Sequence, residues 1–275
     1  MPELPEVESF ATRFRNGTPE HPSLVGWCIQ SAQIFWARSV AQPTPTAFEQ
    51  QIAGQCIQAV GRRGKYLLLQ LSRDMLIIHL RMSGDLFVQR GQAQEISHIR
   101  AEFSFNNGWR LLFRDDRKFG RLWLVENPDS VVGNLGPEPL EAAFTPEWLH
   151  TQLTARSRLV KPLLLDQHFI AGLGNIYTDE ALHRARIHPL RRSDTLTAAE
   201  SETLWRAVRL VLHAGIAANG ASIDWVYRGG GFQNEFLVYG RGGLPCQTCG
   251  TLIEKIVVGQ RGTHICPVCQ PLVRI

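Results

Sequence analysis

The chain has 275 residues, a length that allows one large domain or two small ones. Its hydrophobic fraction of 44% and its charged fraction of 20% are typical of a globular protein and exclude disordered and collagen-like classes. No apolar run approaches the ~20 residues that a membrane-spanning helix needs, and acidic residues stand at the start, where an export signal carries positive charge. We therefore expect a cytoplasmic protein that is not bound to a membrane.

The net charge of +4 is unevenly distributed along the chain. Residues 148–275 hold 14 Lys and Arg against 9 Asp and Glu, whereas residues 1–147 hold 15 against 16. Most of these bases are arginines, whose planar guanidinium binds phosphate bidentately. The excess indicates a surface that binds nucleic acid, although a solvated basic surface explains the charge equally well.

The first half of the chain predicts one helix followed by many strands. Apolar residues at helical spacing in 4–14 predict a helix that begins near Pro5, a residue favoured in the first turn. Short extended runs separated by turn residues follow, at a spacing typical of a β-sandwich or of a barrel-like pair of sheets. We expect strands at 25–36, 55–60, 66–71, 75–80, 85–89, 99–105, 109–113 and 121–125.

The second half of the chain predicts helices. Residues 134–140 contain Gly and Pro and predict a linker, after which the apolar spacing becomes helical. Residues 172–175 predict the turn of a helix–turn–helix, with Asn175 as the N-cap of its second helix. Residues 219–242 are rich in glycine and predict a loop. We expect helices at 146–154, 160–166, 176–184 and 198–217.

Four of the six cysteines form two CxxC pairs with sixteen residues between them: Cys246, Cys249, Cys266 and Cys269. Such pairs match a site in which four thiolates bind one zinc ion, and this structural site leaves no open coordination position. Two local disulfides or redox motifs are the alternatives, and the lack of a secretion signal favours zinc. Cys28 and Cys56 lie in apolar, strand-like segments, so we expect them to be buried free thiols.

The first residues contain a candidate nucleophile. Removal of Met1 would leave Pro2 with a free secondary amine, and an α-amine titrates near pH ~8, so it is far more nucleophilic at neutral pH than a lysine. Its attack on a sugar C1′ would give an iminium, which promotes elimination without needing a further proton. Glu3 follows directly and could donate or relay protons. Taken alone, this Pro-Glu pair is more simply explained as a solvated chain end.

Seven segments stand in order along nearly the whole chain: PELPEVE (2–8), RRGKYLLLQL (62–71), IIHLRMSG (77–84), DDRKFG (115–120), NLGPEPL (134–140), GLGNIYTDEAL (172–182) and the paired CxxC motifs. Together they resemble the formamidopyrimidine-DNA glycosylase (Fpg)/endonuclease VIII family. Enzymes of this family excise oxidised bases and then cleave the DNA backbone at the resulting site. The resemblance implies a monomer that binds damaged double-stranded DNA and has one structural zinc ion as its cofactor.

The fold implied by this resemblance is α+β with two domains. An N-terminal β-sandwich with an N-terminal helix is joined to a helical domain that holds a helix–two-turn–helix and a zinc finger. We expect a catalytic β-sandwich domain at 1–135, a linker at 136–150, a helix–two-turn–helix domain with a lesion-capping loop at 151–240 and a zinc finger at 241–275.

The resemblance also implies roles for single residues. Pro2 matches the Schiff-base nucleophile, and Glu3 matches the proton donor that opens the sugar. Lys65 matches the lysine of β-elimination, and Arg261 matches the arginine of phosphate binding and δ-elimination. The residues that match the phosphate-binding set around the lesion are Lys65, His79, Asn175 and Tyr239.

Three further side chains match those that fill the gap left by the extruded nucleotide: Met82, Arg117 and Phe119. Extrusion costs about a few kcal/mol of lost pairing and stacking, so a side chain must take the place of the base. Met82 and Phe119 would be core residues in most proteins. Turn residues beside them favour loop tips instead.

Several places depart from the family pattern or leave it open. The segment before residue 99 often carries two histidines in the family, and only His98 stands here, as one expected DNA contact. We also expect Arg158 and Lys161 to contact DNA, in a basic cluster where relatives place a lysine. The loop 222–234 is expected to cap the flipped base, and the choice of damaged base depends on it.

We therefore expect a bifunctional DNA glycosylase and AP lyase of the Fpg branch. It would excise 8-oxoguanine and formamidopyrimidines opposite cytosine, followed by β,δ-elimination, in base excision repair. One alternative is an endonuclease VIII-like enzyme for oxidised pyrimidines. Members of that branch have glycine at the position where this chain has Leu4. The other is a non-catalytic zinc-containing DNA-binding protein, which would need none of Pro2, Glu3 and Lys65.

Overall fold

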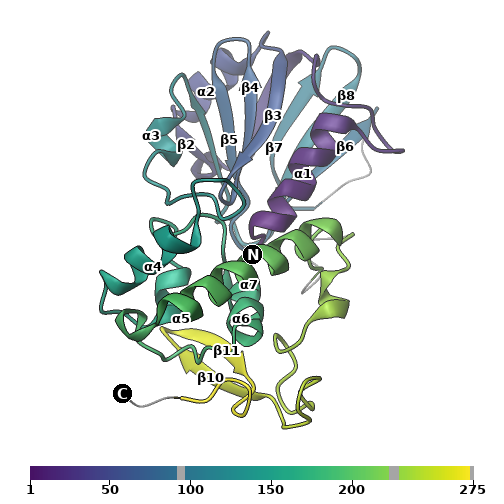
Figure 1. Ribbon diagram of the computed structural model, residues 1–275. Coiled ribbons are helices and arrows are strands. Elements are labelled where there is room, and N and C mark those ends of the chain that lie inside the picture. Colours follow the sequence, from purple (N-terminus) through teal and green to yellow (C-terminus); the bar gives the residue numbers. More distant parts are fainter. Residues whose placement is uncertain (92–96, 223–228, 273–275) are drawn as a thin grey trace. The chain divides into compact units, whose positions relative to one another are not determined.

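The computed structural model describes residues 1–91, 97–222 and 229–272. The chain divides into two compact units, which are described one after the other (Figure 1). The N-terminal unit is built on residues 1–134, and the C-terminal unit on residues 135–221 together with the chain after 230. The expected mixed α+β class is confirmed, because the first unit consists mainly of strands and the second mainly of helices.

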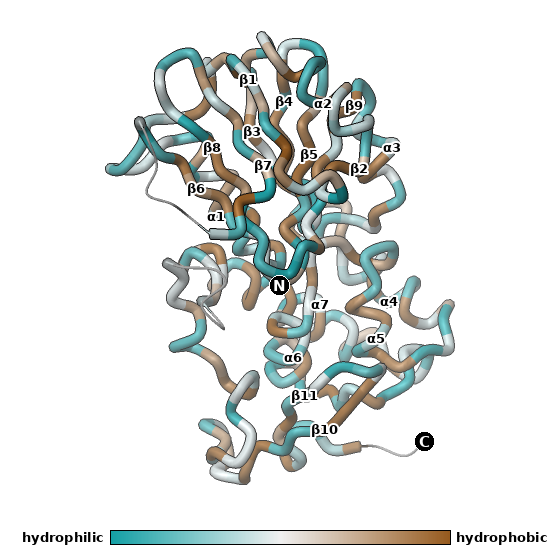
Figure 2. The backbone as a smooth tube through the Cα atoms, turned by 180° about the vertical axis from the view of Figure 1, so that it is seen from behind, coloured by the Kyte–Doolittle hydropathy of each residue, from teal (hydrophilic) through white to brown (hydrophobic). Residues whose placement is uncertain are grey.

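Two sheets form the N-terminal unit. One has the strand order β2-β9-β5-β4-β3 and the other β1-β7-β8-β6. Their inward side chains form one hydrophobic core, and the middle strands β4 and β5 are hydrophobic along most of their length (Figure 2). The strands are β1 (Ile29–Ile34), β2 (Val40–Gln42), β3 (Ile57–Arg63), β4 (Tyr66–Leu71), β5 (Met75–His79), β6 (Gly84–Arg90), β7 (Ile99–Phe105), β8 (Trp109–Asp115) and β9 (Arg121–Val125).

Helix α1 (Leu4–Asn16) packs its apolar stripe into this core, as its sequence predicts. It runs antiparallel to β3, since Arg15 Nε donates to the Val60 carbonyl at 2.9 Å while Glu8 pairs with Arg62 at 3.0 Å. The start of α1 is therefore directed toward the end of β3. The helix stops at Gly17, whose φ of +82° suits a residue without a side chain.

Helix α2 (Pro45–Ile52) was missed by the sequence analysis, as was the short α3 (Asp129–Val132). The signals for α2 were present. Thr44 accepts a hydrogen bond from the Ala47 amide as N-cap, and Pro45 occupies the first helical position. Phe48 and Ile52, four residues apart, are both fully buried.

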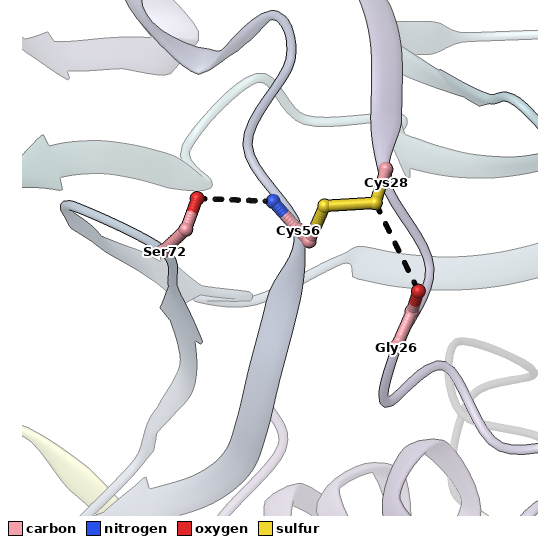
Figure 3. The surroundings of a disulfide bond; sticks show 4 residues. All are labelled: Gly26, Cys28, Cys56 and Ser72. Carbon is pink, nitrogen blue, oxygen red and sulfur yellow. Dashed lines mark hydrogen bonds between the residues drawn. A yellow bond between two sulfur atoms is a disulfide. The ribbon is translucent and has the colours of Figure 1, made fainter.

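Cys28 and Cys56 are not free thiols, so that expectation was wrong (Figure 3). They face each other across an antiparallel bridge with Cα atoms 3.9 Å apart, and their sulfurs form a disulfide. The neighbours of the two cysteines make the backbone hydrogen bonds between these segments, so the two cysteines form a non-hydrogen-bonded pair. Side chains lie closer together in such a pair than in a hydrogen-bonded one. Neither cysteine is fully buried.

The C-terminal unit is helical and ends in a two-stranded hairpin. The long helix α7 packs against both α4 and α6. The elements are α4 (Pro146–Thr154), α5 (Val160–Leu164), α6 (Asn175–Arg184), α7 (Ala198–Ala217), β10 (Glu254–Val258) and β11 (Arg261–Ile265). Across the described part of the chain, none of the helices combines the length and the apolar character needed to cross a membrane.

Candidate DNA-binding and catalytic site

The start of α1 and the β3–β4 turn bring three predicted catalytic residues to one end of the five-stranded sheet. Glu3 is the N-cap of α1, and its buried carboxyl group forms a capping box with Glu6, whose carboxylate accepts the Glu3 amide at 2.7 Å. Pro2 beside it is also buried. Lys65 lies in the two-residue turn that follows β3 and is only 5% exposed. Because α1 is directed toward this turn, the motif PELPEVE and the motif RRGKYLLLQL meet at this end of the sheet.

His79 occupies the same end of the sheet, since it pairs with Tyr66, the residue after Lys65. Its Nδ1 accepts the Arg81 amide at 3.0 Å, so the ring proton is on Nε2. Burial lowers the pKa of His79 to about 3, and the charges of Arg81 and Lys65 act in the same direction. His79 is therefore a neutral donor at physiological pH.

Met82 and Phe119 lie at the tips of two loops, as expected. Met82 follows β5 and is 38% exposed, and Phe119 precedes β9 and is 48% exposed. Each lies next to a residue in the left-handed region, with φ of +54° at Arg81 and +61° at Lys118. The Arg117 guanidinium lies over the Phe119 ring at 5.2 Å. Exposed apolar groups in two conformationally restricted loops suit insertion into a base stack.

A buried hydrogen-bond network joins these two loops, and its members Ser83, Asp115 and Gly120 were not among the predicted site residues. Ser83 donates to Asp115 and accepts the Arg117 amide at 3.0 Å. The second oxygen of Asp115 accepts the Gly120 amide at 2.7 Å. A Cβ at residue 120 would come within 2.3 Å of the Phe113 ring, which explains the glycine. Asp115 and Gly120 are the first and last residues of the motif DDRKFG, so the signal was present.

His98 lies at the start of β7, with its backbone carbonyl accepting the Asp115 amide. Its Nδ1 lies 3.3 Å from an Asp116 carboxylate oxygen, and both side chains are about half exposed. Its predicted DNA contact therefore adjoins the loop that carries Arg117. Residues 223–228 of the expected lesion-capping loop lie outside the described residues.

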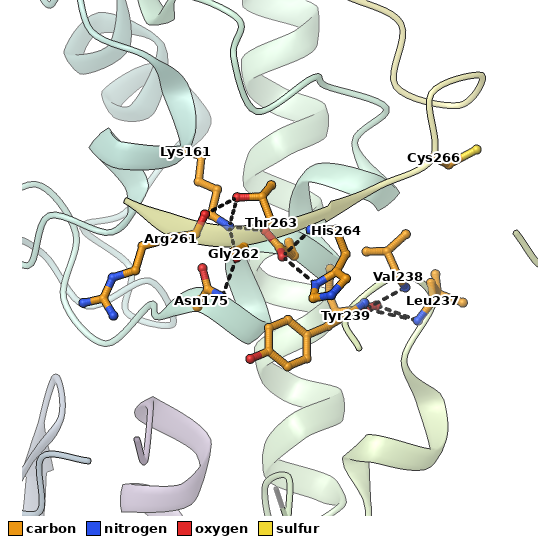
Figure 4. Close-up of polar contacts among 12 residues, drawn as sticks. Lys161, Asn175, Leu237, Val238, Tyr239, Arg261, Gly262, Thr263, His264 and Cys266 are labelled. Atoms are coloured by element: carbon orange, nitrogen blue, oxygen red, sulfur yellow. Dashed lines mark hydrogen bonds and ion pairs between the residues drawn. The ribbon is translucent and has the colours of Figure 1, made fainter. Parts of the chain in front are cut away.

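In the C-terminal unit, the β10–β11 hairpin presents Arg261 (Figure 4). Val258 and Arg261 are joined by Gly259 and Gln260, which both have positive φ, as a tight two-residue hairpin turn requires. Arg261 is exposed, and its side chain extends away from the hydrogen-bonded cluster around Lys161. This placement leaves its guanidinium accessible to a phosphate.

Asn175 is the first residue of α6, and its predicted role as N-cap was wrong. Gly174 is the N-cap, because its extended backbone precedes the helix. The Asn175 side chain instead donates from Nδ2 to the Gly262 carbonyl at 2.9 Å, next to Arg261. The two predicted phosphate-binding residues are therefore neighbours at a helix N-terminus, where anions are favoured.

Lys161 is completely buried, which contradicts a direct DNA contact. Its Nζ lies 2.6 Å from Asp179 Oδ1 and also donates to Thr263 Oγ1 and the Gly262 carbonyl. Its charge is therefore used inside the unit, where it fixes the hairpin strand β11 to α6. Arg158 remains partly exposed and pairs with Asp166 at 2.9 Å.

Tyr239 is positioned by Glu180, a residue of α6 that the sequence analysis quoted only within a motif. The Glu180 carboxylate accepts the amides of Leu237, Val238 and Tyr239 at 2.9–3.1 Å (Figure 4). Burial raises the pKa of Glu180, and these amides act in the opposite direction. The Tyr239 ring packs edge-on against His264, with ring centres 5.2 Å apart.

The four cysteine sulfurs of the C-terminal hairpin region lie within 4.8 Å of one another. The Sγ–Sγ distances are 3.9 Å for Cys246 and Cys269 and 3.4 Å for Cys249 and Cys266. A zinc ion bound by four thiolates at about 2.3 Å needs sulfurs about 3.8 Å apart, so these residues fit the ion. These four cysteines form the structural zinc site that the sequence predicts.

A β-sandwich unit, a helical unit and a four-thiolate zinc site define a zinc-finger protein of mixed fold. Three family models match the chain: the formamidopyrimidine-DNA glycosylase N-terminal domain at 1–122, the H2TH domain of the same glycosylase at 135–226, and a zinc finger found in FPG and IleRS at 243–272. The chain belongs to the formamidopyrimidine-DNA glycosylase family.

Two relatives and two solved structures illustrate this membership. The formamidopyrimidine-DNA glycosylase of Protochlamydia amoebophila is 44% identical, covering 98% of this chain and 99% of its own, and that of Chloroflexus aurantiacus is 45% identical over 98% of both. The Lactococcus lactis FPG bound to a FAPY-dG containing DNA is 35% identical, with a TM-score of 0.89 over 98% of this chain and 100% of its own. MutM in complex with carbocyclic 8-oxo-G containing DNA is 36% identical, with the same TM-score and coverage.

Proposed function

We propose that this protein is a bifunctional DNA glycosylase and AP lyase that removes oxidised purines, 8-oxoguanine and formamidopyrimidines, from duplex DNA. The observation that carries the proposal is the convergence of Pro2, Glu3 and Lys65 at one end of the five-stranded sheet. A DNA-binding module without catalysis needs neither a secondary amine nor a buried carboxyl group beside it.

The reaction follows from the chemistry of these groups. The Pro2 nitrogen attacks C1′ of the damaged nucleotide, and the base leaves with the electron pair of its bond to C1′ and takes up the proton that the Pro2 nitrogen loses. Opening of the sugar ring then gives an iminium between Pro2 and C1′. Glu3 supplies the proton for opening the sugar ring. Loss of a C2′ proton then expels the 3′ phosphate, and a second elimination expels the 5′ phosphate. Lys65 and Arg261 assist these two eliminations.

DNA is held in our proposal by residues of both units. In the N-terminal unit, Nε2–H of His79 donates to a phosphate, and Met82, Arg117 and Phe119 occupy the space of the extruded nucleotide. In the C-terminal unit, Asn175, Arg261 and Tyr239 bind phosphates. Since the relatives are bacterial enzymes, we place this repair in the cytoplasm, at the chromosome.

Borohydride trapping tests the proposal directly. The mature protein is incubated with duplexes that contain 8-oxoguanine opposite cytosine, dihydrouracil or an abasic site, with and without borohydride. We expect a covalent adduct and β,δ-elimination products on 8-oxoguanine. Pro2→Gly should lose most base excision, and Glu3→Gln should bind the duplex without excising the base.

Each alternative predicts a different result in the same experiment. Preferred trapping on dihydrouracil would identify an enzyme for oxidised pyrimidines. Binding without any adduct would identify a non-catalytic DNA-binding protein. A variant with one extra N-terminal residue is the matched control, because it keeps every side chain and removes only the amine from its position.

A further inference from the structure

His183 lies at the C-terminal end of α6, outside the zinc-finger segment 243–272, yet it contacts a zinc ligand. Its Nε2 is 3.6 Å from Sγ of Cys246. His183 is 4% exposed and Cys246 is 3% exposed, so the contact is shielded from water. A cysteine that binds zinc is a thiolate and carries no proton, so in this contact the imidazole must be the donor.

Nδ1 of His183 is buried and has no hydrogen-bond partner among the described residues. The contact with Cys246 is therefore the one polar interaction that the described structure assigns to this ring. Burying a polar side chain without a hydrogen bond costs folding free energy. Packing alone therefore does not explain why a histidine stands at this buried position.

His183 lies on the same face of α6 as two other residues that contact the zinc-finger segment. Asn175, Asp179 and His183 recur every four residues and so follow one stripe of the helix. Asn175 donates to the Gly262 carbonyl, and Asp179 accepts the His264 amide at 3.0 Å. The same stripe therefore contacts the zinc-finger segment at three levels, and His183 provides the level at the metal.

We propose that His183 is a positioning residue of the zinc site, which donates an Nε2–H···Sγ hydrogen bond to the Cys246 thiolate and thereby fixes the zinc finger to α6. Four thiolates around one Zn²⁺ carry a net charge of −2, and a donor to one sulfur lowers its basicity and slows its protonation and release. Changing such outer partners typically reduces metal affinity by about 10-fold to 100-fold. This inference goes beyond the proposed glycosylase function, since it concerns zinc retention and needs no DNA.

Two substitutions separate the hydrogen bond from the volume of the ring. His183→Leu keeps about the same side-chain volume but removes the N–H donor. His183→Gln keeps an N–H donor at about the distance of imidazole Nε2 from the backbone. His213→Leu, at an exposed histidine of α7, is the matched control. The full-length protein is used throughout.

The first measurement is the transfer of zinc from each variant to an excess of a coloured chelator at fixed pH. We expect zinc affinity to fall about 10-fold or more in His183→Leu and to stay within a few-fold of the parent in His183→Gln. The second measurement uses the cobalt-substituted protein. Its sulfur-to-metal charge-transfer band should move to lower energy in His183→Leu and return in His183→Gln, because loss of a donor raises the energy of the sulfur electrons.

Either of two outcomes overturns the proposal. One is a folded His183→Leu variant with parental zinc affinity and an unshifted band. The other is equal loss in His183→Leu and His183→Gln, which would mean that the ring acts through its shape. If His183→Leu does not fold, His183→Asn takes its place, because its shorter amide cannot reach the sulfur, and the same two measurements decide.

Discussion

Ser83 and Arg117 are 34 residues apart in the chain, and the Arg117 amide donates to the Ser83 hydroxyl at 3.0 Å. Through this bond, the loop that carries Met82 is fixed to the loop that carries Arg117 and Phe119. The two sets of side chains proposed to enter the DNA therefore depend on a buried polar group that does not touch DNA.

Ser83→Ala should destabilise this pair of loops. It removes one donor and one acceptor from a buried network, which costs about 1–3 kcal/mol of unfolding free energy. We expect base excision to fall more than binding of abasic DNA, because loosened loops hold the extruded state less well. Denaturant unfolding and single-turnover excision measure the two effects. Ser130→Ala, at an exposed serine, is the control, and equal effects of the two substitutions would contradict the assigned role.

Arg117→Ala should change the choice of the base opposite the lesion. We place Arg117 against the base left without a partner, where a good bidentate contact contributes about 1–3 kcal/mol of discrimination. The preference for cytosine over adenine should fall by roughly ten-fold or more. Excision rates on matched duplexes measure it. Equal loss against all opposite bases would make Arg117 a phosphate contact.

Lys161→Met should affect stability rather than DNA binding. It leaves Asp179 buried without its cation, and breaking a buried ion pair in this way costs about 3–5 kcal/mol. Unfolding of the C-terminal unit should occur at clearly lower denaturant concentration. Arg158→Ala, at a partly exposed ion pair, should cost no more than about 1 kcal/mol. If Lys161→Met kept full stability and only reduced the salt dependence of DNA binding, Lys161 would be a phosphate contact after all.

His79 makes the stability of the protein depend on pH. Its pKa is about 3 in the folded state and near 6.5 when exposed, so below pH 6.5 the unfolded chain takes up a proton that the folded protein does not. Stability is therefore lost as the pH falls from 6.5 toward 3. Between pH 7 and 5 this loss amounts to about 2 kcal/mol.

His79→Asn removes this dependence and keeps an acceptor for the Arg81 amide. Denaturant unfolding at pH 7 and pH 5 should show a smaller loss in the variant than in the parent, by about 2 kcal/mol. The comparison cancels the contributions of other histidines, such as His188, whose pKa is also lowered by burial. Parallel pH dependence of the two proteins would show that His79 becomes protonated without cost.

Local sequence patterns predicted most of this fold, whereas the residues of the DNA-binding and catalytic site were implied by the resemblance to the glycosylase family. The helix at α1 follows from its apolar spacing, and the zinc site follows from the cysteine spacing together with the lack of a secretion signal, because these signals need no contact between distant segments. Contacts between distant segments could not be predicted in this way. Whether Lys161 faces solvent depends on Asp179 and Thr263, and whether Cys28 is a thiol depends on the register that places it opposite Cys56.

Arg81, next to Met82, and Lys118, between Arg117 and Phe119, have backbones in the left-handed region, beside the side chains that we propose enter the DNA. Both side chains are exposed, with Lys118 Nζ 4.2 Å from the centre of the Trp36 ring, so burial places little restriction on which residue stands there. The backbone conformation restricts the choice of residue, because the left-handed region costs a residue other than glycine about 1–2 kcal/mol and costs a β-branched residue more. In related sequences, valine, isoleucine and threonine should therefore be rare at both positions. Glycine and asparagine should be the most frequent substitutions there.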